Sequence, residues 1–280
     1  MKPLFSYLTI GCTALLCVQL SFAQGVKVPA PSPTQTVKQD FALSSVEVSY
    51  SRPAVKGRTI MGDLVPYGKV WRTGANGATT ITFGEDVSIE GKPVKAGKYG
   101  LLTIPGENEW TIILTKSLDV TSPAAYKPEN DVLQVKVKSE ILPFSVENFM
   151  IIFNNITGSS MTMELIWDKT DVPVKITSDV DAKVMTQIEE AMKGEKKPYF
   201  QAASYYLETN RDMKQAITWM DAAIKENPKA FYMYYAKARM QAKAGDKKGA
   251  KATATEGITL AKEAKNDDYV ALNTKLIATL

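Results

Sequence analysis

Basic, amide and aromatic side chains that could bind a ligand are concentrated in two stretches of the sequence, residues 50–58 and 65–83. The first reads Y-S-R-P-A-V-K-G-R, and the second contains V-W-R-T-G-A-N-G. Guanidinium groups bind carboxylates and phosphates through paired hydrogen bonds, and an indole ring packs against a sugar ring or a cation. The two stretches therefore predict a site for an anionic or carbohydrate ligand. Its candidate residues are Arg52, Lys56, Arg58, Trp71, Arg72 and Asn76.

The same residues also have a structural interpretation, which the sequence leaves open. Arg72 would then donate to loop carbonyls, Asn76 would hold an Asx-type turn before the next strand, and Trp71 would fill the core. Gly74 and Gly77 on either side of the asparagine fit a tight turn in both interpretations. The two interpretations make different predictions, because only a ligand site requires these side chains to line a pocket.

Residue types that are missing from the chain exclude several classes of enzyme. The sequence has no histidine, and its two cysteines, Cys12 and Cys17, both lie in the N-terminal apolar segment. Catalytic Ser-His-Asp and Cys-His arrangements are therefore excluded, as is a zinc or copper site built on nitrogen and sulfur. We expect no catalytic residue, metal or cofactor. Acid-base catalysis by carboxylates stays formally open.

The N-terminus has the pattern of a secretory signal peptide. A lysine at position 2 precedes a nearly uninterrupted apolar run over residues 4–20, and Ser21-Phe22-Ala23 places small residues where a signal peptidase cleaves. We predict a signal peptide over residues 1–23, export to the periplasm or the cell exterior, and no membrane span after cleavage. Three prolines follow within residues 24–40, which we predict to be an extended spacer.

The charge of the chain is nearly balanced and evenly distributed. There are 34 Lys and Arg residues against 30 Asp and Glu residues. A nucleic-acid-binding domain concentrates its basic residues on one face or segment. The scattered charges therefore indicate an ordinary solvated surface, and we expect no nucleic-acid partner.

Residues 41–177 have the two-residue period of β-strands. Apolar residues alternate with polar ones from Val46 to Ser51, and the segments on either side of Pro105–Asn108 form a well-marked predicted hairpin. Phe149 to Phe153 is apolar on both faces and predicts a central strand. Met161–Trp167 predicts a further half-buried strand, and Val172–Ile176 predicts a last one. Eight or more short strands without an intervening helix predict an antiparallel, jelly-roll-like β-sandwich.

Residues 178–280 change to a helical period. Ala182, Ala216 and Ala250 are spaced 34 residues apart, which is the tetratricopeptide period, in which small residues let paired helices approach closely. The segment over about 198–265 therefore resembles tetratricopeptide repeats, although most signature residues of the first repeat helix are missing. A plain helical bundle with a chance period is the alternative. A repeat array would offer a surface for a protein partner.

Several phrases of the β-strand region resemble a bacterial secreted family, domain of unknown function 2911, over about residues 45–170. They are S-R-P-A-V-K-G-R, L-V-P-Y-G-K-V-W-R-T-G-A-N, A-T-T-I-T-F, and A-G-K-Y-G-L-L-T-I-P-G followed by W-T-I-I. The resemblance implies export and a β domain, and it implies no activity. Gly77 stands where the family pattern has an acidic or polar residue.

The sequence therefore favours an exported binding or envelope-associated protein without enzymatic activity. Its β domain would recognise a ligand, and its helical domain would dock a partner. One alternative is a carboxylate-dependent hydrolase or lyase that acts on a sugar or an acidic substrate. The other is a purely structural surface protein. The hydrolase alone requires an Asp or Glu at the arginine site.

Overall fold

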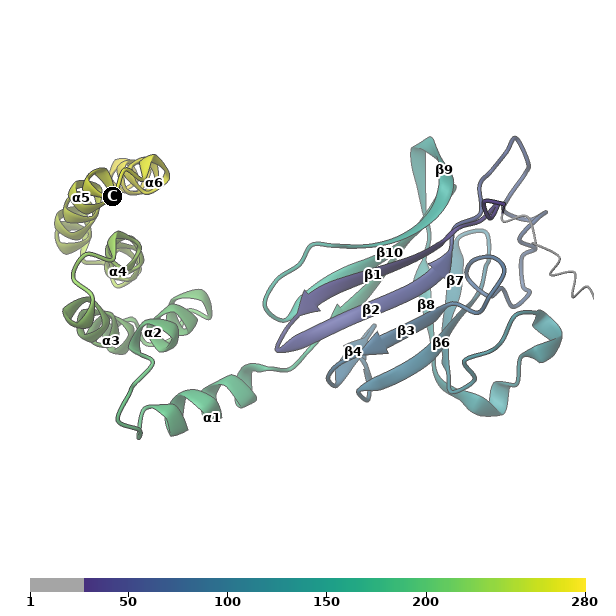
Figure 1. Cartoon of the computed structure of the whole chain (residues 1–280), viewed down its shortest axis with the longest axis horizontal. Coiled ribbons are helices and arrows are strands. Elements are labelled where there is room, and N and C mark those ends of the chain that lie inside the picture. Colours follow the sequence, from purple (N-terminus) through teal and green to yellow (C-terminus); the bar gives the residue numbers. More distant parts are fainter. Residues whose placement is uncertain (1–27) are drawn as a thin grey trace, which may run out of the picture. The chain divides into compact units, whose positions relative to one another are not determined.

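The structure, a computed structural model, describes residues 28–280, which divide into two compact units. The β unit consists of described residues up to Asp40, Ser44–Ile156 and Met161–Ile176, and the helical unit consists of Phe41–Leu43, Thr157–Ser160 and Thr177–Leu280. The predicted signal peptide and residues 24–27 of the predicted spacer lie outside the described residues. Figure 1 shows the elements of both units, most of them labelled.

The larger sheet of the β unit has six strands in the order β1-β2-β3-β6-β7-β8. Four pairs of neighbouring strands, β2–β3, β3–β6, β6–β7 and β7–β8, are antiparallel. The predicted hairpin is confirmed, because β6 and β7 pair from Gly100 with Thr115 to Ile104 with Thr111. The strands are β1 (Thr34–Phe41), β2 (Ser44–Ser51), β3 (Thr80–Phe83), β6 (Gly97–Ile104), β7 (Glu109–Thr115) and β8 (Asp131–Lys138).

The smaller sheet has four strands in the order β5-β4-β10-β9. They are β4 (Val87–Ile89), β5 (Lys92–Val94), β9 (Glu140–Asn154) and β10 (Ser160–Thr177). β9 and β10 are long antiparallel partners whose register shifts between Ile166 and Asp168 and again between Asp168 and Thr170. Asp168 has a left-handed backbone, with φ of 51°. Such irregularities bend a strand and redirect its side chains.

Three sequence predictions about the β unit are corrected. Residues 34–40 are part of strand β1, so the spacer is shorter than predicted. The segments predicted as separate strands near Met161–Trp167 and Val172–Ile176 are one strand, β10. Phe149–Phe153 lies in β9, at the edge of its sheet. That edge is covered locally by residues 53–55, because Phe149 N donates to Pro53 O and Val55 N donates to Glu147 O.

The two sheets contribute side chains to a shared core. The hydroxyl of Tyr50 in β2 accepts a hydrogen bond from Ile151 N in β9 at 2.8 Å. The Tyr50 ring meets Phe149 edge-on, with 5.6 Å between ring centroids. Alternating residues of β2, β8 and β10 are buried as the two-residue pattern predicts. Burial of these apolar residues supplies the main stabilisation, because the described residues contain no cysteine that could form a disulfide.

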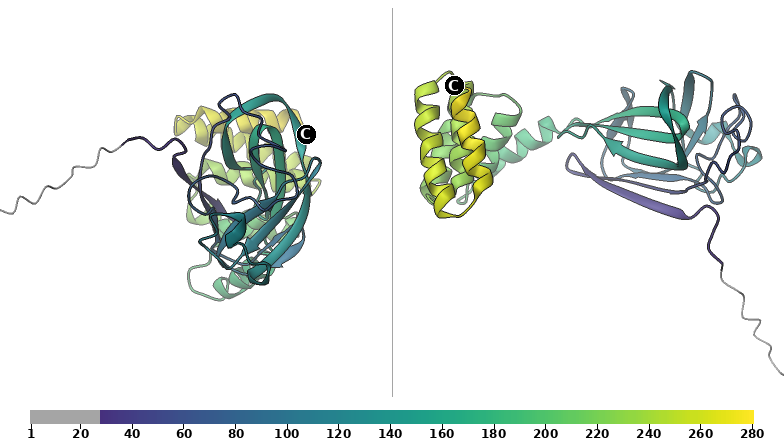
Figure 2. Two further views of the ribbon diagram at one scale, coloured as in Figure 1. Left: turned by 90° about the vertical axis from the view of Figure 1, so that its right-hand side faces the viewer. Right: turned by 90° about the horizontal axis from the view of Figure 1, so that it is seen from above.

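The helical unit contains six α-helices. They are α1 (Asp181–Ala191), α2 (Tyr199–Glu208), α3 (Met213–Glu226), α4 (Phe231–Lys243), α5 (Lys247–Glu263) and α6 (Asp267–Ala278). Successive helices from α2 to α6 contact one another and lie side by side in Figure 2. Short polar connections separate them, and Asp212 and Asp246 cap the N-termini of α3 and α5 by accepting from backbone N–H groups.

Two of the three alanines that are spaced 34 residues apart have the same packing role in the helical unit. Ala216 in α3 and Ala250 in α5 are fully buried, and α2–α3 and α4–α5 form two successive helix pairs. Ala182, in contrast, is exposed in α1, so the first member of the spacing does not share their packing role. Ala223 in α3 and Gly257 in α5 are buried counterparts. These small residues thus mark close helix contacts, and Gly257 also lies close to Asn273 of α6.

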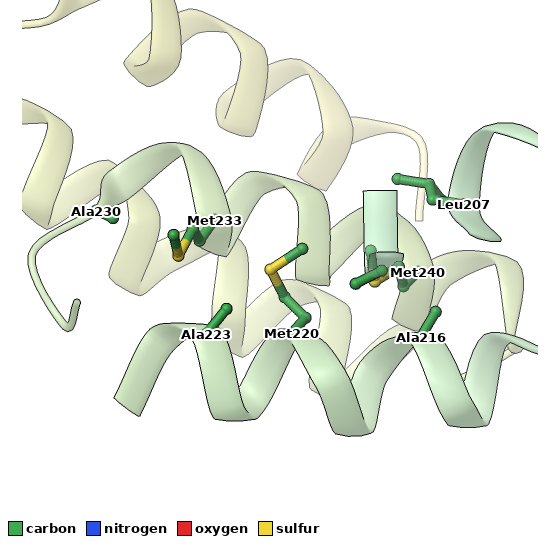
Figure 3. Close-up of a cluster of buried hydrophobic side chains, with 8 residues drawn as sticks. Leu207, Ala216, Met220, Ala223, Ala230, Met233 and Met240 are labelled. Carbon is green, nitrogen blue, oxygen red and sulfur yellow. The ribbon is translucent and has the colours of Figure 1, made fainter. Parts of the chain in front are cut away.

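Methionine and alanine form much of the core between α2, α3 and α4 (Figure 3). Met220 and Met240 are fully buried, and Met233 is nearly so. Flexible methionine side chains fill irregular space between helices that small residues bring close together. Among residues 28–280, no helix is both long and apolar enough to cross a membrane.

Candidate functional site

Residues 53–58 are held against β9 by main-chain hydrogen bonds. Val55 N donates to Glu147 O at 2.8 Å, and Phe149 N donates to Pro53 O at 2.9 Å. Lys56 N donates to the Glu147 side chain at 2.9 Å. The segment then turns through left-handed residues, with φ of 49° at Lys56 and 69° at Gly57. This geometry fixes the backbone from which the next candidate residue, Arg58, extends.

Arg58 folds back onto its own loop. Its Nε donates to Val55 O at 3.0 Å, and one terminal nitrogen donates to Ala54 O. These bonds orient the guanidinium but use only part of its five N–H donors. Arg58 is exposed, and it forms no ion pair with a described residue. Its charge is therefore available to a ligand.

The second candidate stretch is attached to the end of β6. Trp71 exchanges two backbone hydrogen bonds with Thr103, at N···O distances of 2.7 and 3.0 Å, and Gly68 N donates to Pro105 O. Thr73 Oγ1 donates to Thr103 Oγ1 at 3.1 Å. These contacts position the Trp71 indole among the aromatic residues of the core.

Trp71 lies at the centre of an aromatic cluster. It stacks on Trp167 of β10 with 5.8 Å between ring centroids and 15° between ring planes. It meets Phe149 and Trp110 edge-on, at 5.1 and 6.1 Å. Much of its ring is therefore occupied by protein, although the residue stays partly exposed. The cluster joins the two sheets and makes a rigid wall beside the arginines.

The backbone beside this wall has two unusual residues. Thr73 is fully buried and has φ of 54°, a left-handed conformation that is uncommon for a β-branched residue. The next residue, Gly74, has φ of 156°, and a Cβ there would come within 3.0 Å of Ser51 O and Thr79 Oγ1. Conformations of this kind persist where the surroundings fix them, and they are often found at binding sites.

Hydrogen bonds connect Arg72 to Asn76 and Asn76 to the chain before β1. A terminal nitrogen of Arg72 donates to Asn76 O at 3.0 Å. Asn76 Nδ2 donates to Ser32 O at 2.9 Å, and Asn76 itself has a left-handed φ of 56°. The loop thereby attaches the chain just before β1 to the site. Arg72 is half-buried and has no acidic partner among residues 28–280.

Arg58, Trp71 and Arg72 line a cavity of about 250 Å³. Two guanidiniums and two indoles contribute to its wall, and the other lining residues are small, apolar or carry a hydroxyl. The described residues that line it include no Asp or Glu. They are Ser32, Pro53, Arg58, Leu64, Val65, Trp71, Arg72, Gly74, Ala75 and Trp167.

The structure brings three of the six predicted site residues together. Arg58, Trp71 and Arg72 line the cavity. Arg52 instead donates from Nε to Phe149 O at 3.0 Å and holds β9 in place. Lys56 and Asn76 are exposed and do not line the cavity. Asn76 has the turn conformation that the structural interpretation predicts, and it supports the cavity through Ser32.

Sequence reasoning missed two parts of the cavity wall, Trp167 and Ser32. Trp167 belongs to β10, almost a hundred residues after Trp71, and its place in an alternating strand indicated only a half-buried side chain. Its indole N–H donates to Glu147 O at 3.3 Å, which fixes the ring. Ser32 falls in the predicted spacer. Neither carried a sequence signal that would link it to the arginines.

The buried carboxyl of Asp171 does not line the cavity. Asp171 in β10 is buried, and burial together with the nearby charges of Glu164 and Glu140 raises the pKa of its carboxyl to about 6. Within the described part of the chain, no group of three or more acidic side chains is placed to hold a metal ion. The described lining of the cavity thus combines two arginines with no carboxylate that could act as an acid or base.

The fold and the cavity define a protein with a β unit that carries an arginine- and tryptophan-lined cavity, followed by a unit of packed helices. The chain belongs to the family described as protein of unknown function (DUF2911), whose model matches residues 32–176, more than half of the chain. The match begins two residues before β1 and ends in β10, so it covers the β unit. No curated protein and no solved structure matches the chain.

Proposed function

We propose that this is an exported binding protein without enzymatic activity, whose β unit binds a small ligand in the cavity beside Arg58, Trp71 and Arg72. One observation carries the proposal. Arg58 from one loop and the adjacent Trp71 and Arg72 from a second loop line the same cavity, and none of the described lining residues is acidic. A half-buried arginine such as Arg72 normally has acidic partners or carbonyl acceptors for most of its donors. Arg72 has one such acceptor, Asn76 O, and a ligand would supply the others.

The same observation speaks against the hydrolase alternative. Hydrolysis of a sugar by carboxylates needs an acid and a base or nucleophile next to the scissile bond. The described residues that line the cavity supply neither. The purely structural alternative accounts for the side chains of Arg52, Arg72 and Asn76, which donate to main-chain carbonyls. It gives no reason for two arginines without an acidic partner to line one cavity.

A ligand screen on the mature protein tests this proposal. Neutral and anionic sugars and other small anions would be added to the wild type, Arg72→Ala and Lys56→Ala, and the thermal midpoint of each would be measured. We expect at least one compound to raise the midpoint of the wild type and of Lys56→Ala, because Lys56 lies outside the cavity. Arg72→Ala should not respond.

The contrary result of the screen is equally specific. If no compound shifts the wild type and Arg72→Ala only lowers the midpoint, the arginine has a structural role and the binding proposal fails. Arg72→Lys separates the two roles further, because it keeps the charge but loses the planar fork of donors. A binding role predicts weaker but measurable ligand response in that variant.

Within this proposal the β unit is a jelly-roll-like sandwich, and the helical unit is a short tetratricopeptide-like array that docks a protein partner. Aromatic contacts support a docking role. Tyr269 of α6 contacts Phe231 and Tyr235 of α4, at 5.0 and 5.9 Å between ring centroids, and all three are only partly buried. Tyr235→Ala should reduce partner capture from the envelope fraction without changing the secondary structure.

Export is part of the proposal and has its own test. The predicted signal peptide requires the mature chain to begin at Gln24. Mass spectrometry of the protein isolated from the periplasm or the medium should find that N-terminus. A chain that keeps residues 1–23 in the cytosol would contradict export.

A further inference from the structure

We infer that the ligand of the Arg58–Arg72 cavity is a small molecule that carries a doubly charged oxyanion, a phosphate monoester or a dicarboxylate, on a compact apolar body. This inference rests on the proposed function and adds the chemical class of the ligand. It follows from the charge of the cavity, from the N–H donors of its two arginines and from its apolar surface.

The charge of the cavity comes from two cations without a counter-ion. Arg58 and Arg72 both line it. The ion pairs of the described chain involve other residues and none of these two. Arginine stays protonated in proteins, so both charges persist at every ordinary pH. A doubly negative group neutralises the pair, whereas a single carboxylate leaves one charge without a partner.

The donors that remain suit an oxyanion. Arg58 uses Nε and one terminal nitrogen on the carbonyls of residues 55 and 54, and Arg72 uses one terminal nitrogen on Asn76 O. The bonds fix both guanidiniums yet leave most of their N–H groups without an acceptor among the described residues. Such preorganised forks bind phosphate and carboxylate oxygens in pairs.

The remaining lining residues determine the size and polarity of the uncharged part of the ligand. Leu64, Val65 and Pro53 contribute apolar surface, and Trp71 and Trp167 contribute aromatic surface. The cavity volume of about 250 Å³ is below the roughly 300–1,000 Å³ of sites for drug-sized molecules. A compact apolar or ring-bearing body therefore fits, and a long polymer would have to extend into solvent.

Three ring-bearing probes that differ in charge test this inference by isothermal titration of the mature protein. Phenyl phosphate is a dianion above its second pKa of about 6, phthalate is a dicarboxylate, and benzoate carries one charge. We expect at least one dianion to bind about tenfold or more tightly than benzoate at about pH 8. A preference for phenyl phosphate or for phthalate identifies the source of the dianion.

The pH dependence of phenyl phosphate binding tests whether the second charge matters. Phenyl phosphate should lose most of its advantage over benzoate at about pH 5, because it is then largely a monoanion. Arg72→Ala should weaken dianion binding about tenfold to a hundredfold, since a hydrogen bond to a charged group contributes about 1.5–3 kcal/mol. Arg58→Ala, at an exposed position, should also weaken it, and Lys56→Ala should not.

Three other outcomes would contradict the ligand class or the location of the site. If benzoate binds as tightly as both dianions and loses affinity in Arg72→Ala, the ligand class is wrong and the binding cavity stands. If all three probes fail while a neutral sugar raises the midpoint in the ligand screen, the inference fails and the proposed function stands. If dianions bind equally to wild type and to both arginine variants, the cavity is not their site.

Discussion

Asp171 of β10 lies directly opposite Glu140 of β9 in the antiparallel register. Residues that face each other across two strands share one face of the sheet, and like charges in that position repel. Asp171 is only 9% exposed, and its Oδ1 has no hydrogen-bond partner among the described residues. The β unit thus contains a carboxyl group whose ionisation is unfavourable, on a strand that also contributes Trp167 to the cavity.

The first prediction concerns the pH dependence of stability. The carboxyl pKa is raised from 3.8 to about 6, by burial first and by Glu164 and Glu140 next. Between these values the unfolded chain loses its proton while the folded chain keeps it, so the free energy of unfolding falls as pH rises and is constant above about pH 6. Asp171→Asn should therefore stabilise the protein above pH 6, by at most about 3 kcal/mol.

Chemical denaturation at several pH values measures this effect. The gain from Asp171→Asn should disappear below about pH 4, where the carboxyl is protonated in both states. Asp63→Asn serves as the control, because Asp63 is an exposed turn residue. A stabilisation that is the same at pH 4 and at pH 8 would contradict the assignment.

The second prediction compares the two glycines that flank Ala75 and Asn76. Gly74→Ala should destabilise the β unit by about 1–3 kcal/mol, because φ is 156° and the new Cβ would lie 3.0 Å from Ser51 O and Thr79 Oγ1. Gly77→Ala should change stability by less than about 0.5 kcal/mol, since its Cβ would meet no atom within 4 Å. Urea unfolding of both variants checks the difference, and equal effects would argue against the described loop.

The third prediction concerns the hydroxyl that joins the two sheets. Tyr50→Phe removes the acceptor of Ile151 N, which lies 2.8 Å from the Tyr50 oxygen, and leaves a buried N–H without a partner. We expect a loss of about 1–3 kcal/mol in the free energy of unfolding. Tyr67→Phe, at a residue that is 40% exposed, should be nearly neutral. Similar losses in both variants would show that the hydroxyl of Tyr50 is not the cause.

The fourth prediction concerns the core of the helical unit. Met220→Ala would leave a cavity among α2, α3 and α4, and we expect a cost of about 2–5 kcal/mol. Thermal unfolding followed by the helical circular dichroism signal measures it. Lys214→Ala, on the exposed side of the same helix, should have little effect. A midpoint for Met220→Ala equal to that of Lys214→Ala would contradict the packing.

Much of the secondary structure could be predicted because it follows from local patterns. The alternation in β2 and β8 and the turn between β6 and β7 depend on residues close together in the sequence. The helices likewise follow from their period and from the caps at Asp212 and Asp246. Strand β1 was missed because three prolines lie just before it and because most of its own residues are polar.

The candidate site shows the same limit. The sequence named the arginines and Trp71 from their types, which is why half of the predicted residues line the cavity. It could not separate Arg58 and Arg72 from Arg52, because all three have the same chemistry and differ only in which carbonyls lie nearby. Arg52 meets Phe149 O, which is 97 positions away along the chain.

The sequence by itself determined the chemistry that is available: arginines, indoles and carboxylates, without imidazole anywhere and with cysteines only near the N-terminus. It also determined the change from a two-residue period to a helical one. The tertiary structure decided which arginines line the cavity and that no described acidic residue lies beside them in its wall. It also decided that Trp167 stacks on Trp71. These are relations between distant segments, and a periodic pattern of neighbouring residues contains no information about them.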